Sequence, residues 1–369
     1  MIRTLIRGAT LLLFVPIASA AGGLGAAQAA ATCTPTGFVR DSMNLTAAII
    51  NPTSPVKGQV DATGCNIGVY YSPSSPGGRV TRADVFGANY YGVVNNGSEV
   101  DVTESSIHDI GESPLNGDQH GVAVYFAFDN PSTGSIRDNL IYNYQKGGIV
   151  VNGPGSEADV TGNAVLGQGP VNYIAQNGIQ FGYGSTGEAR DNFVYGNSYT
   201  GGNFASSGGI LVVGGAGYGS PTTNNVHVQD NVLVGNDVGV WFSNVDASFN
   251  PPATPTNDVA VNNDIRDSAV NNTTGFGAAD AYQAGISEEG NGDRLAHNDI
   301  DGLGYTPVTP PPHIYCIDDT LTTSPIERDN SCPGSHSGEG EDSRSASSVS
   351  LHRAAHNRLS ELRQQSIVR

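Results

Sequence analysis

Residues 147–167 read GGIVVNGPGSEADVTGNAVLG and contain two short phrases that recur through the middle of the chain. The first phrase is a glycine followed by an apolar residue, any residue and a second apolar residue. Subtracting the positions of its seven copies gives intervals of 29, 27, 30, 31, 30 and 46 residues, for copies that begin at Gly92, Gly121, Gly148, Gly178, Gly209, Gly239 and Gly285. A nearly constant period of this length indicates a repeat solenoid.

The second phrase has a small polar residue at its centre and an aliphatic residue two positions later. Its seven copies are centred on Ser105, Asn139, Asn163, Asn192, Asn231, Asn263 and Asn298. Both phrases are short and have period-two character, which favours strands over amphipathic helices. Stacking such repeats about 4.8 Å apart builds a continuous core. An Asn at a repeated corner can hydrogen-bond to the Asn of the next repeat, so we interpret this column as structural.

These phrases resemble those of the right-handed β-helix repeat proteins in the pectate-lyase-like superfamily. The resemblance covers residues 65–304 and implies an all-β fold, a right-handed parallel β-helix of about seven to nine rungs. The composition of 49 Gly, 20 Pro and 14% charged residues suits many turns and short strands. The family includes polysaccharide lyases, polygalacturonase-like hydrolases and non-catalytic surface proteins, so the resemblance implies a fold more narrowly than a function.

Two terminal segments differ in composition from the repeats. Residues 1–31 contain Arg3 and Arg7, an apolar run over residues 11–17 and then small residues, which predicts a secretory signal cleaved between residues 20 and 32. A membrane anchor is the alternative, but the apolar run is too short to favour it. We therefore expect a secreted, extracellular protein without a membrane span. The expected divisions are an N-terminal cap at 32–64, the β-helix at 65–304, a C-terminal cap at 305–333 and a disordered or weakly helical tail at 334–369.

The four cysteines flank the repeats, two before and two after. Export favours their oxidation, and three pairings are formally possible. We expect the local pairing, Cys33 with Cys65 and Cys316 with Cys332, because it would staple the two ends where a solenoid exposes strand edges. No Cys/His cluster predicts a metal site.

The net charge of −18 is concentrated in the repeat region. Without the predicted signal and tail, 17 − 7 = 10 basic and 35 − 4 = 31 acidic residues remain, so residues 32–333 carry about −21. Such a surface disfavours nucleic acid and anionic membranes as partners. We expect a monomer that binds a polysaccharide or other glycan, and we expect no resident cofactor. Calcium is the one ion that could be structural or could bridge an acidic substrate.

Aligning the repeats on the glycine phrase predicts a row of corner residues. Tyr91, His120, Lys146 and Asn177 occupy this corner in successive repeats, so we expect His120 and Lys146 to lie side by side. His120 closes the polar stretch 116–121, which also contains Asp118. We take Lys146, His120 and Asp118 as candidate catalytic residues, and the candidate substrate-binding residues are Glu112, Tyr91, Tyr144, Gln145, Tyr173, Gln176 and Asn177.

These residues fit two reactions on a polysaccharide and one non-catalytic role. In β-elimination, Lys146, its pKa lowered by His120, would remove the proton next to a uronate carboxylate. In hydrolysis, Asp118 with Glu112 or Asp109 would flank the glycosidic bond. The alternative is that they are solvated turn residues of a secreted carbohydrate-binding or surface protein. The sequence matches neither the calcium, aspartate and arginine set of pectate lyases nor the paired aspartates of polygalacturonases, so both function classes remain open.

Overall fold

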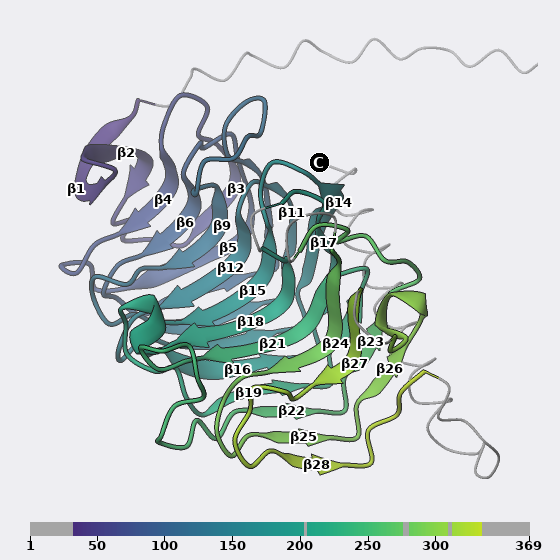
Figure 1. Cartoon of the computed structure of the whole chain (residues 1–369). Helices are drawn as coiled ribbons and strands as arrows, with labels where there is room; N and C mark the ends of the chain where they lie inside the picture. The colour runs from purple at the N-terminus through teal and green to yellow at the C-terminus, as the bar shows by residue number, and fades with distance from the viewer. Residues whose placement is uncertain (1–31, 203–204, 276–279, 309–311, 334–369) are drawn as a thin grey trace, which may run out of the picture.

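The computed structural model describes residues 32–202, 205–275, 280–308 and 312–333, and it is a parallel β-helix (Figure 1). Its regular structure consists of strands, apart from two single 3₁₀ turns among the described residues, η1 (Ala216–Tyr218) and η2 (Leu303–Tyr305). The predicted all-β solenoid is confirmed. The predicted signal at 1–31 and the predicted tail at 334–369 lie outside the described residues.

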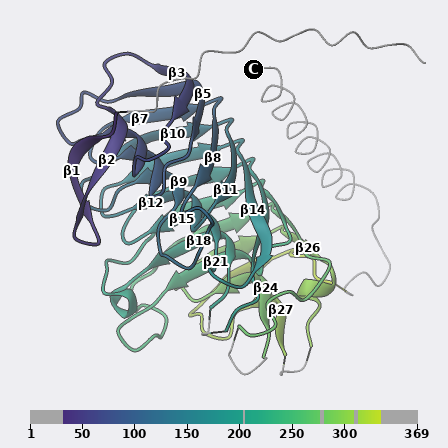
Figure 2. The same cartoon turned by 90° about the horizontal axis from the view of Figure 1, so that it is seen from above.

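One face of the solenoid is an 11-stranded sheet in which every neighbouring pair is parallel except β1 with β2. Figure 2 shows its strands following one another along the solenoid axis. Its nine strands from β4 onward agree with the seven to nine rungs expected. In order the strands are β1 (Thr34–Arg40), β2 (Met43–Ile50), β4 (Ile67–Tyr71), β6 (Tyr91–Asn95), β9 (Val122–Phe126), β12 (Gly147–Asn152), β15 (Asn177–Gly182), β18 (Gly208–Gly214), β21 (Val238–Asn244), β24 (Tyr282–Glu288) and β27 (His313–Asp318).

The other strands form two parallel ladders that are joined by the long strand β5 (Gly78–Phe86), which pairs with the first strand of each ladder and with β3 (Val56–Asp61). The first ladder contains β7 (Val100–Thr103), β10 (Thr133–Arg137), β13 (Glu157–Thr161), β16 (Thr186–Arg190), β19 (Val226–Gln229), β22 (Val259–Val261), β25 (Arg294–Ala296) and β28 (Ile326–Arg328). The second contains β8 (Ser106–Ile110), β11 (Leu140–Tyr144), β14 (Ala164–Val171), β17 (Phe193–Tyr199), β20 (Val232–Val234), β23 (Asp264–Arg266) and β26 (Asp299–Asp301). Each complete turn thus supplies one strand to each of three faces.

The two sequence phrases meet inside the solenoid. A β-carbon on Gly148 would lie 2.4 Å from Cγ1 of Val165 and 2.6 Å from the carbonyl oxygen of Gly178 in the next rung. Val165 is the aliphatic residue of the second phrase, two positions after Asn163. The same conflict recurs between Gly178 and Val194. In these rungs glycine is required because the 11-stranded sheet lies too close to the opposite ladder to leave room for a β-carbon.

The alignment at Gly121 was wrong by two residues. Strand β9 pairs with β12 so that Val122 stands opposite Gly147, which places Ala123 rather than Gly121 opposite Gly148. Gly121 instead has φ +87° at the end of the preceding loop, a conformation that favours glycine. A copy that the alignment missed begins at Gly68, where a β-carbon would lie 2.5 Å from the carbonyl oxygen of Gly92.

The predicted asparagine ladder is present. The side-chain amide of Asn163 donates to Oδ1 of Asn192 at 3.0 Å and to the carbonyl oxygen of Ile136 at 2.8 Å. Comparable bonds link the later members, and the ladder extends one residue beyond the predicted set to Asn330. Each asparagine satisfies buried polar groups of two rungs, so the structural interpretation is confirmed.

The two ends of the solenoid carry the disulfides Cys33–Cys65 and Cys316–Cys332, which confirms the local pairing. Strands β2 and β3 lie within the segment expected to be the N-terminal cap, and both already pair with rung strands. Strands β27 and β28 continue two of the parallel ladders through the segment expected to be the C-terminal cap. Regular β-structure therefore extends into both segments.

Candidate functional site

The loop between β8 and β9 brings together three of the predicted site residues. Glu112, Asp118 and His120 each present a carboxylate oxygen or ring nitrogen within 4.8 Å of the others. His120 Nε2 lies 2.9 Å from Glu112 Oε1, and the His120 side chain is buried whereas Asp118 is exposed. The polar stretch singled out in the sequence is therefore a compact cluster of possible acids, bases and metal ligands.

One buried glutamine holds this loop in place. Gln145 is fully buried, and its Oε1 accepts hydrogen bonds from the backbone N–H groups of Glu112 and Asn116 at 3.1 and 3.0 Å. Its Nε2 donates to the carbonyl oxygens of Asp118 and His120 at 2.8 and 3.4 Å. The structure thus places Gln145 beneath the loop, where its amide positions the three side chains above it.

Gln176, one rung further along, likewise holds a loop through hydrogen bonds to backbone groups. It is fully buried, its Nε2 donates to the carbonyl oxygen of Tyr144 at 2.7 Å, and its Oε1 accepts from the backbone N–H of Gln168 at 3.0 Å. Tyr144 itself is a core residue whose hydroxyl donates to Asn197 Oδ1 at 2.6 Å. Tyr173 lies in the loop after β14, where it is partly exposed.

Lys146 lies one residue out of the predicted register with His120. Its backbone N–H donates to the carbonyl oxygen of Gly121 at 2.9 Å, so Lys146 stands opposite Gly121 and Gln145 stands opposite His120. The ammonium group donates to the carbonyl oxygen of Ala175 at 2.8 Å. Burial lowers the pKa of Lys146 to about 8. The pKa shift needed for a base is therefore present, with burial rather than His120 as its cause.

A chain of aromatic rings leads from the loop cluster to the outer face of the 11-stranded sheet. The imidazole of His120 stacks on Tyr90 with ring centroids 3.9 Å apart. Tyr90 meets Tyr91 edge-on at 6.0 Å, and Tyr91 stacks on Tyr125 at 4.9 Å. Tyr91, a predicted binding residue, thus connects the cluster with the sheet face.

The central part of that outer face carries a strip of amide side chains. Gln180 donates from Nε2 to Asn152 Oδ1 at 3.0 Å, and Asn177 Nδ2 lies 3.4 Å from Gln180 Oε1. Asn177 was predicted from the corner alignment, whereas Asn152 and Gln180 were missed. Gln180 occupies the third, unconstrained position of the glycine phrase, and side chains at that position point outward because they alternate with the buried ones.

A second aromatic group lies on the same face toward the C-terminus, and sequence reasoning missed it. Trp241, the single tryptophan of the chain, also occupies the third phrase position. Its Nε1 donates to Glu289 Oε1 at 3.3 Å, and Ser243 Oγ donates to Glu289 Oε2 at 2.7 Å. The ring of Tyr282 lies 6.5 Å from that of Trp241. Burial raises the pKa of Glu289, and the charge of Asp318 adds to the effect, so this carboxyl holds its proton more tightly than an exposed one.

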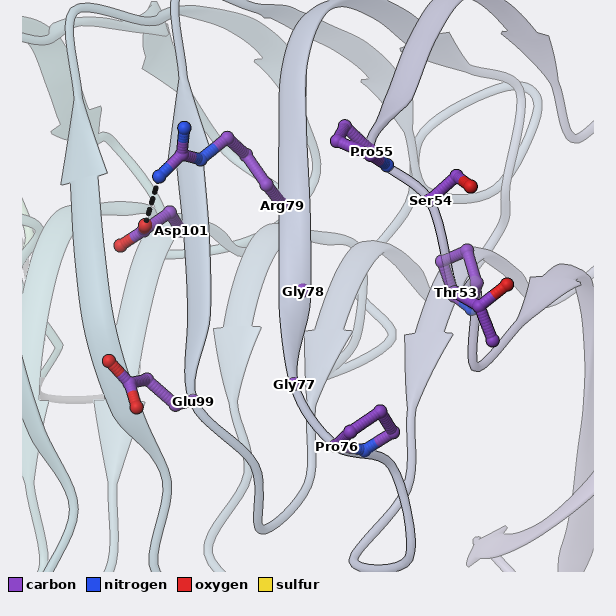
Figure 3. A pocket seen from close by; sticks show the side chains of 10 residues that line it. Thr53, Ser54, Pro55, Pro76, Gly77, Gly78, Arg79, Glu99 and Asp101 are labelled. Atoms are coloured by element: carbon purple, nitrogen blue, oxygen red, sulfur yellow. Dashed lines mark hydrogen bonds and ion pairs between the residues drawn. The ribbon is translucent and has the colours of Figure 1, made fainter.

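A polar pocket of about 350 Å³ lies near the N-terminal end, beside β3, β5 and β7 (Figure 3). Its only basic side chain, Arg79, pairs with Asp101 at 3.1 Å, and Glu99 lies nearby. Prolines line much of the rest, and no aromatic ring faces it. Because its charges are largely neutralised and it offers no stacking surface, the sheet face is the stronger candidate for glycan binding.

Comparison of the chain with protein-family models, with curated proteins and with solved structures finds no match in any of the three. Within the described ranges, no helix has the length and apolar character needed to cross a membrane.

Proposed function

We propose that this protein is a secreted member of the pectate-lyase-like β-helix proteins that binds polysaccharide along the outer face of its 11-stranded sheet. The observation that carries the proposal is the pair of partly exposed side chains Gln180 and Trp241 on this face, beside the buried amides of Asn152 and Asn177. Amides exchange hydrogen bonds with sugar hydroxyls, and aromatic rings pack against the apolar faces of sugar rings. Gln180 and Trp241 occupy the same register position two rungs apart, about 10 Å along the solenoid axis, so one chain-like ligand can reach both.

The charge of the protein favours a neutral glycan. Residues 32–333 hold 31 acidic and 10 basic residues, and the basic Arg79, Arg137, Arg190 and Arg266 are paired with carboxylates. A polyuronate would meet repulsion over most of such a surface. The predicted signal and the two disulfides support an extracellular location for this encounter.

Catalysis on a polysaccharide is the second candidate function. Lys146 favours it, because a pKa of about 8 leaves a usable fraction of neutral amine near neutral pH. In a lyase Lys146 would act as the base, and the substrate would be a polyuronate rather than a neutral glycan. In a hydrolase Asp118 would act with Glu112. The alternative remains a carbohydrate-binding protein without catalytic activity.

The proposal is tested by affinity electrophoresis of the full chain through gels that contain neutral or acidic polysaccharides. We expect retardation by at least one neutral polysaccharide, and at least about tenfold weaker binding for Gln180→Ala and Trp241→Ala, the loss expected from about 1.4 kcal/mol of contact energy. The matched control is Tyr195→Ala, an exposed aromatic residue on the β17 face, which should bind like the wild type.

Binding by the Tyr195 variant that is as weak as that of the Trp241 variant, or no retardation of the wild type by any polysaccharide, would contradict the proposal. The same incubations separate the reactions. A lyase produces both absorbance from unsaturated uronates and new reducing ends, a hydrolase produces the reducing ends alone, and a binding protein produces neither.

A further inference from the structure

Three side chains of the loop between β8 and β9 have the geometry of a metal-binding group. The ligand atoms of Glu112, Asp118 and His120 all lie within 4.8 Å of one another, and they are the one such group of three among the described residues. Protein ligands lie about 2.0–2.2 Å from a transition-metal ion, so ligand atoms around one ion are about 3–4 Å apart. Asp118 is exposed, so its side chain has room to rotate toward the other two ligands.

The surrounding structure holds these ligands in position before any ion binds. The amide of Gln145 bonds to the backbone of Glu112, Asp118 and His120. Stacking on Tyr90 fixes the plane of the imidazole, and Asn89 Nδ2 donates to Glu112 Oε1 at 3.1 Å. Groups that orient metal ligands in this way strengthen binding, because less freedom is lost when the ion arrives.

Negative charge converges on the cluster without a basic partner other than His120. Within the described residues no Lys or Arg forms an ion pair with Glu112 or Asp118. A further carboxylate, Asp41, accepts a hydrogen bond from the Tyr90 hydroxyl at 3.3 Å. A bound dication would neutralise this field.

We propose that Glu112, Asp118 and His120 bind one divalent transition-metal ion of the Zn²⁺ or Mn²⁺ type. The imidazole nitrogen distinguishes this site from a calcium site, because Ca²⁺ takes six to eight oxygen ligands. Three protein ligands leave coordination positions open to water or to an oxygen of another molecule. The site lies at the start of the ring chain His120–Tyr90–Tyr91–Tyr125, which links it to the outer face of the 11-stranded sheet.

A second histidine with two acidic neighbours provides a matched control. His108 Nε2 lies 3.0 Å from Asp84 Oδ1, and His108 Nδ1 lies 2.7 Å from Asp109 Oδ2. The two carboxylates contact opposite nitrogens of the ring, so the three groups cannot share one ion. Like the proposed site, this group has one imidazole and two carboxylates, but its geometry differs.

The test is isothermal titration of the full, EDTA-treated chain with ZnCl₂, MnCl₂ and CaCl₂ in separate runs. We expect one equivalent of Zn²⁺ or Mn²⁺ to bind more tightly than Ca²⁺. His120→Ala and Asp118→Asn should each weaken this binding at least about tenfold, whereas His108→Ala should leave it unchanged. Because Asp118 is exposed and Asn has the same shape, Asp118→Asn should retain the wild-type unfolding temperature and decides the question if His120→Ala fails to fold.

Absence of Zn²⁺ and Mn²⁺ binding to the wild type would overturn the proposal. So would equal binding by the wild type and Asp118→Asn, loss of binding in His108→Ala alone, or binding of Ca²⁺ alone. None of these outcomes depends on polysaccharide binding, so the metal site and the proposed function can fail independently.

Discussion

The neighbouring glycines Gly147 and Gly148 allow a direct test of why the repeat needs its glycine. Both are buried residues of β12 with extended backbone conformations, but a β-carbon on each would meet different surroundings. On Gly148 it would lie 2.4 Å from Val165 Cγ1 and 2.6 Å from the carbonyl oxygen of Gly178. On Gly147 the nearest atoms would be Cγ2 of Val150 at 3.1 Å and Cγ2 of Val122 at 3.6 Å.

The magnitude follows from these contacts. Carbon atoms normally approach to about 3.5–4.0 Å, so Gly148→Ala creates an overlap of about 1 Å. The oxygen of Gly178 belongs to the backbone of the next rung and cannot retreat without breaking the ladder. Overpacking costs about 1–3 kcal/mol, and we expect the upper end, about 3 kcal/mol. For Gly147→Ala the nearest atoms are the ends of valine side chains, which can move slightly. Alanine also reduces the conformational entropy of the unfolded chain, which offsets the cost of the close contact. The free energy of unfolding should therefore change by less than about 0.5 kcal/mol.

The measurement is urea unfolding followed by circular dichroism, together with the thermal midpoint. A loss of about 3 kcal/mol should lower the midpoint of Gly148→Ala by about 5 °C in a solenoid of this length, with little change for Gly147→Ala. Equal stability of the two variants would show that the close approach of the 11-stranded sheet to Val165 is not what selects glycine in this phrase.

Two further predictions concern the buried polar groups. Asn192→Ala removes two donated and two accepted hydrogen bonds, whose partners are Val160, Asn231 and Asn163. It should lower the free energy of unfolding in urea by about 3–5 kcal/mol. A similar loss in the exposed control Asn172→Ala would contradict the ladder explanation. Burial and the nearby charge of Asp293 raise the pKa of Glu288, so the folded state retains a proton that the unfolded chain loses above about pH 4. The unfolding temperature should therefore fall as the pH rises from 5 to 8.5. Glu288→Gln should flatten this pH dependence, whereas the exposed control Glu99→Gln should not. Parallel curves for the Glu288 variant and the wild type would refute the assignment of this pH dependence to Glu288.

The sequence predicts the interior of this protein better than its surface. The glycine phrase and the asparagine column recur because each member faces the same buried neighbours in every rung, as Gly148 and Asn163 do. The predicted register is wrong at Gly121, because the loop before β9 has a different length and the inward-facing position falls two residues later, at Ala123. Counting from a glycine cannot reveal such a shift, because this glycine is selected by its positive φ angle rather than by lack of space.

The candidate site was predicted in part for the same reason. Glu112, Asp118 and His120 could be found because they crowd one short stretch of a chain with few histidines. The positioning role of Gln145 could not be predicted, because it depends on the direction of its side chain relative to a loop from the preceding rung. Glu289 and Trp241 are far apart in sequence and become neighbours only through the pairing of β21 with β24.

Both candidate surfaces lie where the repeat pattern imposes nothing on the sequence. Gln180 and Trp241 occupy the third phrase position, which faces outward and tolerates any residue, and the metal-type cluster occupies the loop that breaks the register. A solenoid can vary such positions without loss of its core, because each rung is stabilised by the buried positions alone. Function in this chain should therefore be sought in the residues that the repeat does not explain, and a polar side chain such as Gln180, flanked by apolar residues at the same position of neighbouring rungs, is more informative than one that follows the pattern.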